Sequence, residues 1–148
     1  MKLEEEIKQP RFSSPHQKAL INLIFTSNWV MSRQQDFFKP FGITSQQFNI
    51  LRILKGCYPK GISGTEIKSR MLDKNSDVSR LLDRLAGKGL VERKVCPVDK
   101  RASDIFITTD GLALLEKLQP HRQELDNLLK LSSEEATLLS DLLDRARG

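Results

Sequence analysis

The apolar positions of the chain follow helical spacing over most of its length, and prolines, glycines and capping residues mark the breaks. Ser14 followed by Pro15 is typical of a helix start, and apolar residues at helical spacing follow it. Pro40 and Gly42 indicate the end of this helix. The pattern therefore predicts a long first helix over residues 14–40.

Three pairs of residues with Ser/Thr-x-x-Glu/Gln spacing predict further helix starts, because each pair can satisfy two free backbone N–H groups. The helix after the first pair is expected to end near Tyr58, and the short helix after the second to turn Ile67, Met71 and Leu72 inward. The third opens a last helix with four leucines. The pairs are Thr44 with Gln47, Ser63 with Glu66, and Ser132 with Glu135.

The segment from Ser76 to Lys88 predicts a helix with two unlike faces, ended by Gly89. Apolar residues at i, i+3, i+4 and i+7 form one buried stripe, namely Val78, Leu81, Leu82 and Leu85. The opposite face carries short hydroxyls and charges, namely Ser76, Asp77, Ser79, Arg80, Asp83 and Arg84. A turn with Asp73, Lys74 and Asn75 precedes the helix.

Two short β-prone runs, Leu90 to Val95 and Ile105 to Thr108, flank the polar connector CPVDKRASD and predict a hairpin with a charged tip. Thr108 and Thr109 then cap a fifth helix, which precedes Pro120. The predicted order is four helices, a hairpin and two helices, without an internal repeat. The 148 residues suit one domain.

Composition excludes several classes of protein. The chain is 39% hydrophobic and 29% charged, and no run approaches the ~18 apolar residues of a membrane span. Its N-terminus, MKLEEEIKQPRF, does not resemble a secretion signal, so we expect a cytoplasmic protein without membrane contact. Cys57 and Cys96 lack metal or redox spacing, and His16 and His121 form no ligand cluster. We expect no cofactor, no metal and no enzymatic activity.

The net charge of +5 is compatible with a nucleic-acid partner but does not identify one. Residues 66–101 hold ten Lys/Arg against six Asp/Glu, whereas residues 109–148 hold five against eight. Residues 1–65 also carry a net charge of +5, so charge alone does not locate a binding surface.

Two short helices joined by a tight turn, the second with an arginine-bearing outer face, are the parts of a helix-turn-helix. Such a helix fits the DNA major groove, and a thin hairpin carrying Lys100 and Arg101 suits the minor groove. Arg80 and Arg84 could equally be the solvated charges of an exposed helix face. Asp77 and Asp83 repel phosphate, unless they pair with these arginines or Asp83 accepts from a cytosine amino group.

The run SDVSRLLDRLAGKGLVERKVCPVDKRASDIFITTDG, Ser76 to Gly111, resembles the recognition helix and wing of MarR-family regulators. Asp99 and Arg101, followed by a strand that closes in Thr108, match the wing signature, and TSQQFNILRIL from Thr44 extends the resemblance. The strand closes as FITTDG where many relatives have Leu before the Thr. With the flanking helices the resemblance covers nearly the whole chain.

The resemblance implies a mainly α (α+β) winged helix-turn-helix with a two-stranded wing, in a single domain over residues 1–148. Residues 14–40 and 109–147 would be dimerisation helices, and residues 44–108 the DNA-binding lobe. The implied function is a homodimeric repressor on an inverted-repeat operator in double-stranded DNA. The alternative is a winged-helix module that binds protein or RNA.

The implied site residues fall into three groups. The DNA-contacting residues would be Lys74, Asn75, Ser76, Ser79, Arg80, Arg84, Lys100 and Arg101. Asp99 would structure the wing. Such families often bind a small aromatic effector, whose pocket would here be lined by Phe25, Trp29, Phe48 and Tyr58, although aromatic residues at helical spacing are more often plain core.

Overall fold

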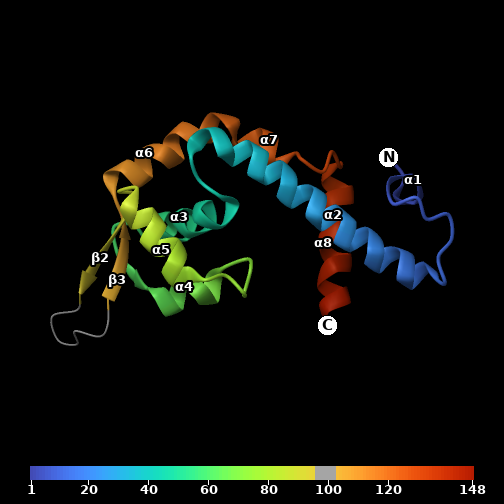
Figure 1. The fold of residues 1–148 in the computed structure, drawn as a ribbon, viewed down its shortest axis with the longest axis horizontal. Helices are drawn as coiled ribbons and strands as arrows, with labels where there is room; N and C mark the ends of the chain where they lie inside the picture. The colour runs from blue at the N-terminus through green and yellow to red at the C-terminus, as the bar shows by residue number, and fades with distance from the viewer. Residues whose placement is uncertain (96–102) are drawn as a thin grey trace. The chain divides into compact units, whose positions relative to one another are not determined.

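The computed structural model describes residues 1–95 and 103–148 of the chain, which fold into two compact units, Met1–Lys117 and Leu118–Gly148 (Figure 1). The secondary structure is mainly helical. In chain order the elements are α1 Leu3–Glu6, α2 Pro15–Phe38, the 3₁₀ helix η1 Lys39–Phe41, α3 Ser45–Cys57, β1 Ile62–Ser63, α4 Gly64–Arg70, α5 Val78–Gly87, β2 Val91–Val95, β3 Ser103–Ile107, α6 Thr109–Leu118, the 3₁₀ helix η2 Gln119–His121, α7 Arg122–Asp126 and α8 Ser133–Arg147.

The long first helix is confirmed as α2, and its ends follow from the residues that predicted them. The Ser14 hydroxyl accepts a hydrogen bond from the Gln17 backbone N–H at 3.1 Å. The chain leaves α2 through η1, which contains Pro40, and turns at Gly42, whose φ of 72° lies in the left-handed region. Short α1, which the sequence pattern did not predict, precedes α2.

Helix α3 begins with the predicted capping box. The Thr44 hydroxyl accepts from the Gln47 backbone N–H, and the Gln47 side chain accepts from the Thr44 backbone N–H, each at 3.1 Å. Although polar, Gln47 is only 2% exposed. It also accepts at 3.3 Å from Lys88, whose ammonium group donates to the Gly42 carbonyl as well. The segment just after α5 is thus tied to the start of α3.

The predicted hairpin is confirmed as β2 and β3, which pair antiparallel with Val91 opposite Ile107. The sheet has a third strand that the sequence pattern did not predict. Strand β1 pairs with β3, placing Ile62 opposite Ile105, so that the strand order is β1-β3-β2. A two-residue strand is too short for period-2 alternation to reveal.

The core of the first unit lies where α3, α4 and α5 meet the sheet (Figure 1). Its apolar side chains come from all of these elements and exclude water, which stabilises the unit through the hydrophobic effect. They include Ile50, Leu51, Leu54, Ile67, Met71, Val78, Leu81, Leu82, Leu85, Ile105 and Ile107.

Two details of α4 differ from the expectation. Leu72 is 88% exposed and does not face inward. Helix α4 ends at Arg70, so helical spacing no longer sets the direction of the Leu72 side chain. Ser63 does cap α4, accepting from the Glu66 backbone N–H at 3.1 Å, but the Glu66 side chain pairs with Arg70 at 2.9 Å and leaves the box half formed.

In the second unit, α8 begins at the predicted capping box of Ser132 and Glu135. Four leucines follow at helical spacing, as expected, yet no residue of α8 is buried. Leu138 and Leu142 are 59% and 48% exposed. Leu139 and Leu143 are half-buried, so the apolar face of this helix is only partly covered within its own unit.

Gly111, in the first turn of α6, allows this helix to approach the sheet closely. A Cβ atom there would lie 2.4 Å from the Leu90 carbonyl oxygen and 2.7 Å from Ile107 Cγ1. We expect Gly111→Ala to lower the free energy of unfolding by about 1–3 kcal/mol, because the backbone must shift. Chemical denaturation provides the measurement. Gly56→Ala in α3 is the control, since its Cβ would meet nothing within 4 Å; an equal loss in both variants would contradict this packing.

Candidate nucleic-acid interface

Helix α5 presents the two unlike faces that its sequence predicts. The apolar stripe is buried, whereas Ser79, Arg80, Asp83 and Arg84 are exposed. The helix begins at Val78 instead of near Ser76, because the Asp77 side chain accepts from the Arg80 backbone N–H at 3.1 Å and so forms the N-cap.

Ser76 does not lie on the exposed face, and this expectation was wrong. The residue is only 4% exposed, since it lies ahead of the helix in the turn that packs against α3. Its hydroxyl lies 3.5 Å from the Gln46 amide nitrogen, which also donates to Asp73 at 3.3 Å. Ser76 therefore helps to hold the turn in place.

The turn between α4 and α5 is fixed by contacts to its backbone. The Leu72 N–H donates to Asn49 Oδ1 at 3.0 Å, and the Asn75 N–H donates to Asp73 Oδ1 at 2.9 Å. The Lys74 ammonium group donates to the Ser69 carbonyl near the end of α4. Lys74 and Asn75 are both exposed and lie immediately before the start of α5.

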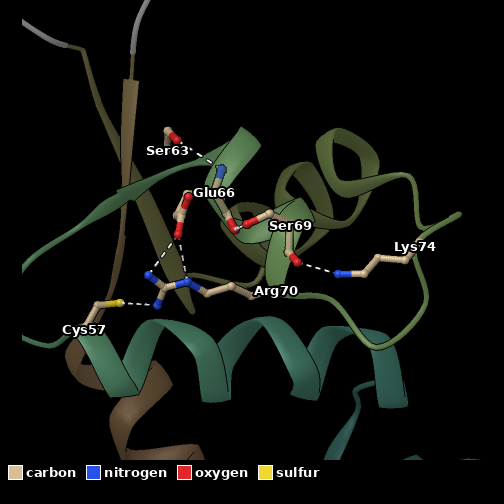
Figure 2. Close-up of polar contacts among 6 residues, drawn as sticks. All are labelled: Cys57, Ser63, Glu66, Ser69, Arg70 and Lys74. Carbon is tan, nitrogen blue, oxygen red and sulfur yellow. Dashed lines mark hydrogen bonds and ion pairs between the residues drawn. The ribbon is translucent and has the colours of Figure 1, made fainter. Parts of the chain in front are cut away.

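A second polar network links α4 to the end of α3 (Figure 2). Arg70 donates to Glu66 through Nε at 3.0 Å, and a guanidinium nitrogen lies 3.5 Å from the Cys57 sulfur. The hydrogen bond to the Glu66 carboxylate raises the pKa of Arg70 above its ordinary value. The Ser69 hydroxyl donates to the Glu66 carbonyl at 2.7 Å. Because Lys74 donates to the Ser69 carbonyl, Lys74 belongs to the same network.

The Asp83 carboxylate is paired with a residue that sequence reasoning did not single out. Arg93 of β2 reaches Asp83 Oδ1 at 2.8 Å and also lies 3.4 Å from the Ser79 carbonyl oxygen. The partners considered in the sequence, Arg80 and Arg84, are not the ones used. Because Asp77 caps the helix and Asp83 pairs with Arg93, both carboxylates of this face have partners within the protein.

A polar groove lies between the starts of α4 and α5 and reaches strand β3. It contains three expected contact residues, Asn75, Ser76 and Ser79, together with Thr65 and Lys68 of α4, which the sequence analysis missed. Arg84 lies elsewhere, in a groove beside Lys39 and Lys88. The missed α4 residues are polar and exposed, but nothing in their own spacing indicates that α5 lies beside them.

The wing strands carry Lys94, whose ammonium group lies 4.7 Å from the centre of the Phe106 ring. The predicted wing residues Asp99, Lys100 and Arg101 lie outside the described residues, as does Cys96. Their expected roles remain predictions.

The four aromatic residues predicted to line an effector pocket are not brought together. Phe25 and Trp29 of α2 line a cavity against α1. Phe48 stacks on Phe38 with ring centres 4.6 Å apart, and Tyr58 is 57% exposed. Helical spacing alone did not reveal that α1 covers the first pair.

In residues 1–95 and 103–148, no group of three or more His, Cys, Asp or Glu side chains could hold a metal ion. None of the helices in these ranges has the length and apolar character needed to cross a membrane.

Comparison with known proteins places these features in context. Residues 43–103 match the model of the MarR family. The chain is 31% identical over 117 residues to the HTH-type transcriptional repressor YetL of Bacillus subtilis, covering 75% of this chain and 70% of the relative. It is 32% identical to the multiple antibiotic resistance protein MarR of Salmonella typhimurium over 117 residues, covering 74% and 77%.

A solved structure gives a similar result across the full length. The crystal structure of a mutant MarR from E. coli complexed with operator DNA aligns with a TM-score of 0.73 and 31% sequence identity. The alignment covers 99% of each chain.

The Asp83–Arg93 pair leads to a prediction about the affinity for duplex DNA. The predicted effect of removing Asp83 is opposite to the effect expected from its charge alone. Asp83→Asn removes a negative charge, which by itself strengthens DNA binding. If Asp83 positions Arg93 and the wing, we expect Asp83→Asn to weaken binding. In the Asp83→Asn background, Arg93→Gln should then lower the affinity for duplex DNA only through its own lost positive charge, because the contact with Asp83 is already absent.

Titrations of both single variants and the double variant on one duplex at fixed salt provide the measurement. The control is Glu92→Gln, which removes the 3.3 Å partner of Lys94 on the same strand. Since exposed pairs contribute only about 0–1 kcal/mol to stability, the fold should survive in each variant. Tighter binding by Asp83→Asn would contradict the positioning role.

Proposed function

Because this chain belongs to the MarR family of DNA-binding transcriptional regulators, and is not an enzyme, we propose that it represses transcription as a homodimer on an inverted-repeat operator. The observation that carries the proposal is the set of polar groups on the exposed face of α5. Its exposed face offers hydroxyl and guanidinium groups, while Asp77 and Asp83 are occupied within the protein. The face therefore presents donors to DNA without free carboxylates beside them.

The DNA contacts that we propose divide by chemistry. Ser79 and Arg80 lie in the first turn of α5, which enters the major groove in helix-turn-helix proteins, and are assigned to base edges. Lys74 and Arg84 are assigned to phosphates on either side, together with Lys68 from the groove beside α5. Asn75 lies in that groove as well. The remaining wing contacts, assigned from the family resemblance, are Lys100 and Arg101, with Asp99 shaping the wing.

A winged-helix module for protein or RNA was the alternative. Its support was the presence of Asp77 and Asp83 on the exposed face, since carboxylates repel phosphate. The two internal partnerships weaken that argument, and the similar proteins are named transcriptional regulators, so duplex DNA is the better proposal.

The homodimer is proposed from uncovered apolar surface. Leu138 and Leu142 of α8 are exposed, and so are several apolar side chains of α2. Large exposed apolar patches mark interaction sites, and symmetric dimers are the commonest assemblies. The α2 residues are Leu20, Leu23, Ile24 and Met31. A small effector that relieves repression is also proposed, and we place such a repressor in the cytoplasm.

Arg80 provides the test of base recognition. A bidentate arginine contact to guanine is worth roughly 1–3 kcal/mol of discrimination, so we expect Arg80→Ala to relax one position of the preferred site. Selection of bound sequences from a random duplex pool measures this. The control is Arg52→Ala on α3, which removes the same charge from the chain. If Arg80→Ala weakens all sequences equally, Arg80 contacts phosphate instead.

The dimer is tested by placing charge on the apolar face of α8. We expect the double variant Leu138→Asp/Leu142→Asp to sediment as a monomer, because two carboxylates cannot be buried in an apolar interface. It should bind the operator far more weakly and with a shallower salt dependence, since about half the phosphate contacts are lost.

The matched control for the dimer is Ser140→Asp, which adds charge to another face of the same helix. The operator selected by the unmodified protein should contain half-sites about 10 base pairs apart, or a close multiple. An unmodified protein that sediments as a monomer at micromolar concentration, yet binds a single half-site tightly, would overturn the dimer.

A further inference from the structure

The C-terminal end of α5 is held by hydrogen bonds to two other parts of the chain. On one side, the Lys88 ammonium group donates to the Gly42 carbonyl, in the turn after η1, and to Gln47 Oε1 of α3 at 3.3 Å. On the other side, the Gly89 carbonyl accepts from the Thr108 hydroxyl at 2.6 Å, directly before α6. The segment after α5 is therefore joined to the starts of both α3 and α6.

The position of Lys88 along the helix explains how its side chain reaches these acceptors. Residues three and seven positions apart share a helix face, so Lys88 follows Leu85 and Leu81 on the buried side of α5. An apolar residue there would extend the buried stripe, whereas lysine brings a charged donor to the edge of the core. Its acceptor Gln47 is only 2% exposed and also accepts from the Thr44 backbone N–H at 3.1 Å. Lys88 thus meets an acceptor that is already fixed in place.

The apolar stripe and the Lys88 contacts restrain α5 in different ways. Apolar packing is not directional, whereas hydrogen bonds weaken steeply away from their preferred distance and angle. Because α5 has 10 residues, a tilt of about 10° at its C-terminal end would move its first turn by about 2–3 Å. A shift of this size is comparable to the length of a hydrogen bond, so the first turn would lose its alignment with any partner.

We propose that Lys88 is a positioning residue for DNA recognition, which fixes the tilt of α5 and so directs Ser79 and Arg80 toward base edges without contacting DNA itself. The effect on sequence preference rests on the base contacts proposed above for Ser79 and Arg80. Lys88 differs in this respect from Lys74, whose proposed role is to contact a phosphate. The charge of Lys88 is used inside the protein, to join α5 to the turn that follows α2 and η1.

Lys39 provides a matched control for Lys88. Both lysines line the groove beside the end of α5, so removing either one changes the charge of the same surface by the same amount. In residues 1–95 and 103–148, no hydrogen bond or ion pair involves the Lys39 ammonium group. Lys39→Met therefore removes a charge alone, whereas Lys88→Met also removes the hydrogen bonds to Gly42 and Gln47.

The experiment measures the affinity of each full-length variant for two duplexes at fixed salt. One is the duplex that the unmodified protein selects from a random pool, and the other has the same base composition in scrambled order. We expect Lys88→Met to lower the ratio of the two affinities about fivefold or more, as loss of one bidentate base contact does. Lys39→Met should leave the ratio unchanged, because a lost charge weakens binding to any sequence. Partial unfolding would also leave the ratio unchanged, since it removes binding-competent protein equally for both duplexes.

Two further variants test how Lys88 acts. Lys88→Arg keeps a charged donor at this position and should retain most of the affinity ratio. In the Arg80→Ala background, Lys88→Met should lower the ratio much less than in the unmodified protein, because the contact that it positions is already absent. An equal fall in both backgrounds, or equal ratios for Lys88→Met and Lys39→Met, would overturn the positioning role.

An NMR measurement without DNA separates the role of Lys88 from the proposed function. We expect Lys88→Met, but not Lys39→Met, to shift the backbone amide signals of Ser79 and Arg80 in the free protein, because the first turn of α5 moves. Unchanged signals of both residues in Lys88→Met would overturn the proposal. If the unmodified protein binds both duplexes equally, the proposed base contacts fail, and the amide signals alone decide whether Lys88 sets the tilt of α5.

Discussion

Burial of one stripe of α5 determines which of its residues face solvent. Val78, Leu81, Leu82 and Leu85 are all less than 9% exposed, and each large apolar side chain buried in this way contributes about 1.5–3 kcal/mol. Rotating the helix about its axis would expose these side chains and bury arginines. The exposure of Arg80 is therefore set by the residues on the opposite side of the helix, and the DNA contact that we propose for Arg80 depends on the core.

Charge imposes a second condition on the same face. A basic surface attracts DNA, but the carboxylates required for other purposes must not repel it. Here Asp77 accepts a hydrogen bond from the backbone at the start of α5, and Asp83 forms an ion pair with Arg93 on strand β2. Asp77 thus organises the start of the helix, and the charge of Asp83 is offset locally by Arg93. Counting charges along the sequence misses this arrangement, because the partner of Asp83 comes from another element.

The sequence predicted the helices best where local chemistry determines them. The caps at Ser14, Thr44 and Ser132 and the stripe of α5 depend on neighbours within a few residues, and all were confirmed. Apart from Leu72 and the half-formed box at Ser63, the errors concern contacts made at long range. Ser76 is buried because α3 packs against its turn, and β1 exists because β3 provides its partner. The groove residues Thr65 and Lys68 likewise become neighbours of α5 only through packing.

The pairing of β1 with β3 has a consequence for folding order. Ile62 and Ile105 are adjacent in the sheet, yet all of α4 and α5 lies between them in the chain. Closing so long a loop costs conformational entropy, which is recovered only when the intervening helices are packed. The third strand therefore makes the wing strand and the helix-turn-helix unfold together. A chain that has lost β3 by local unfolding has also lost packing that orients α4 and α5, so the DNA contacts that we propose for α5 require the sheet to be intact.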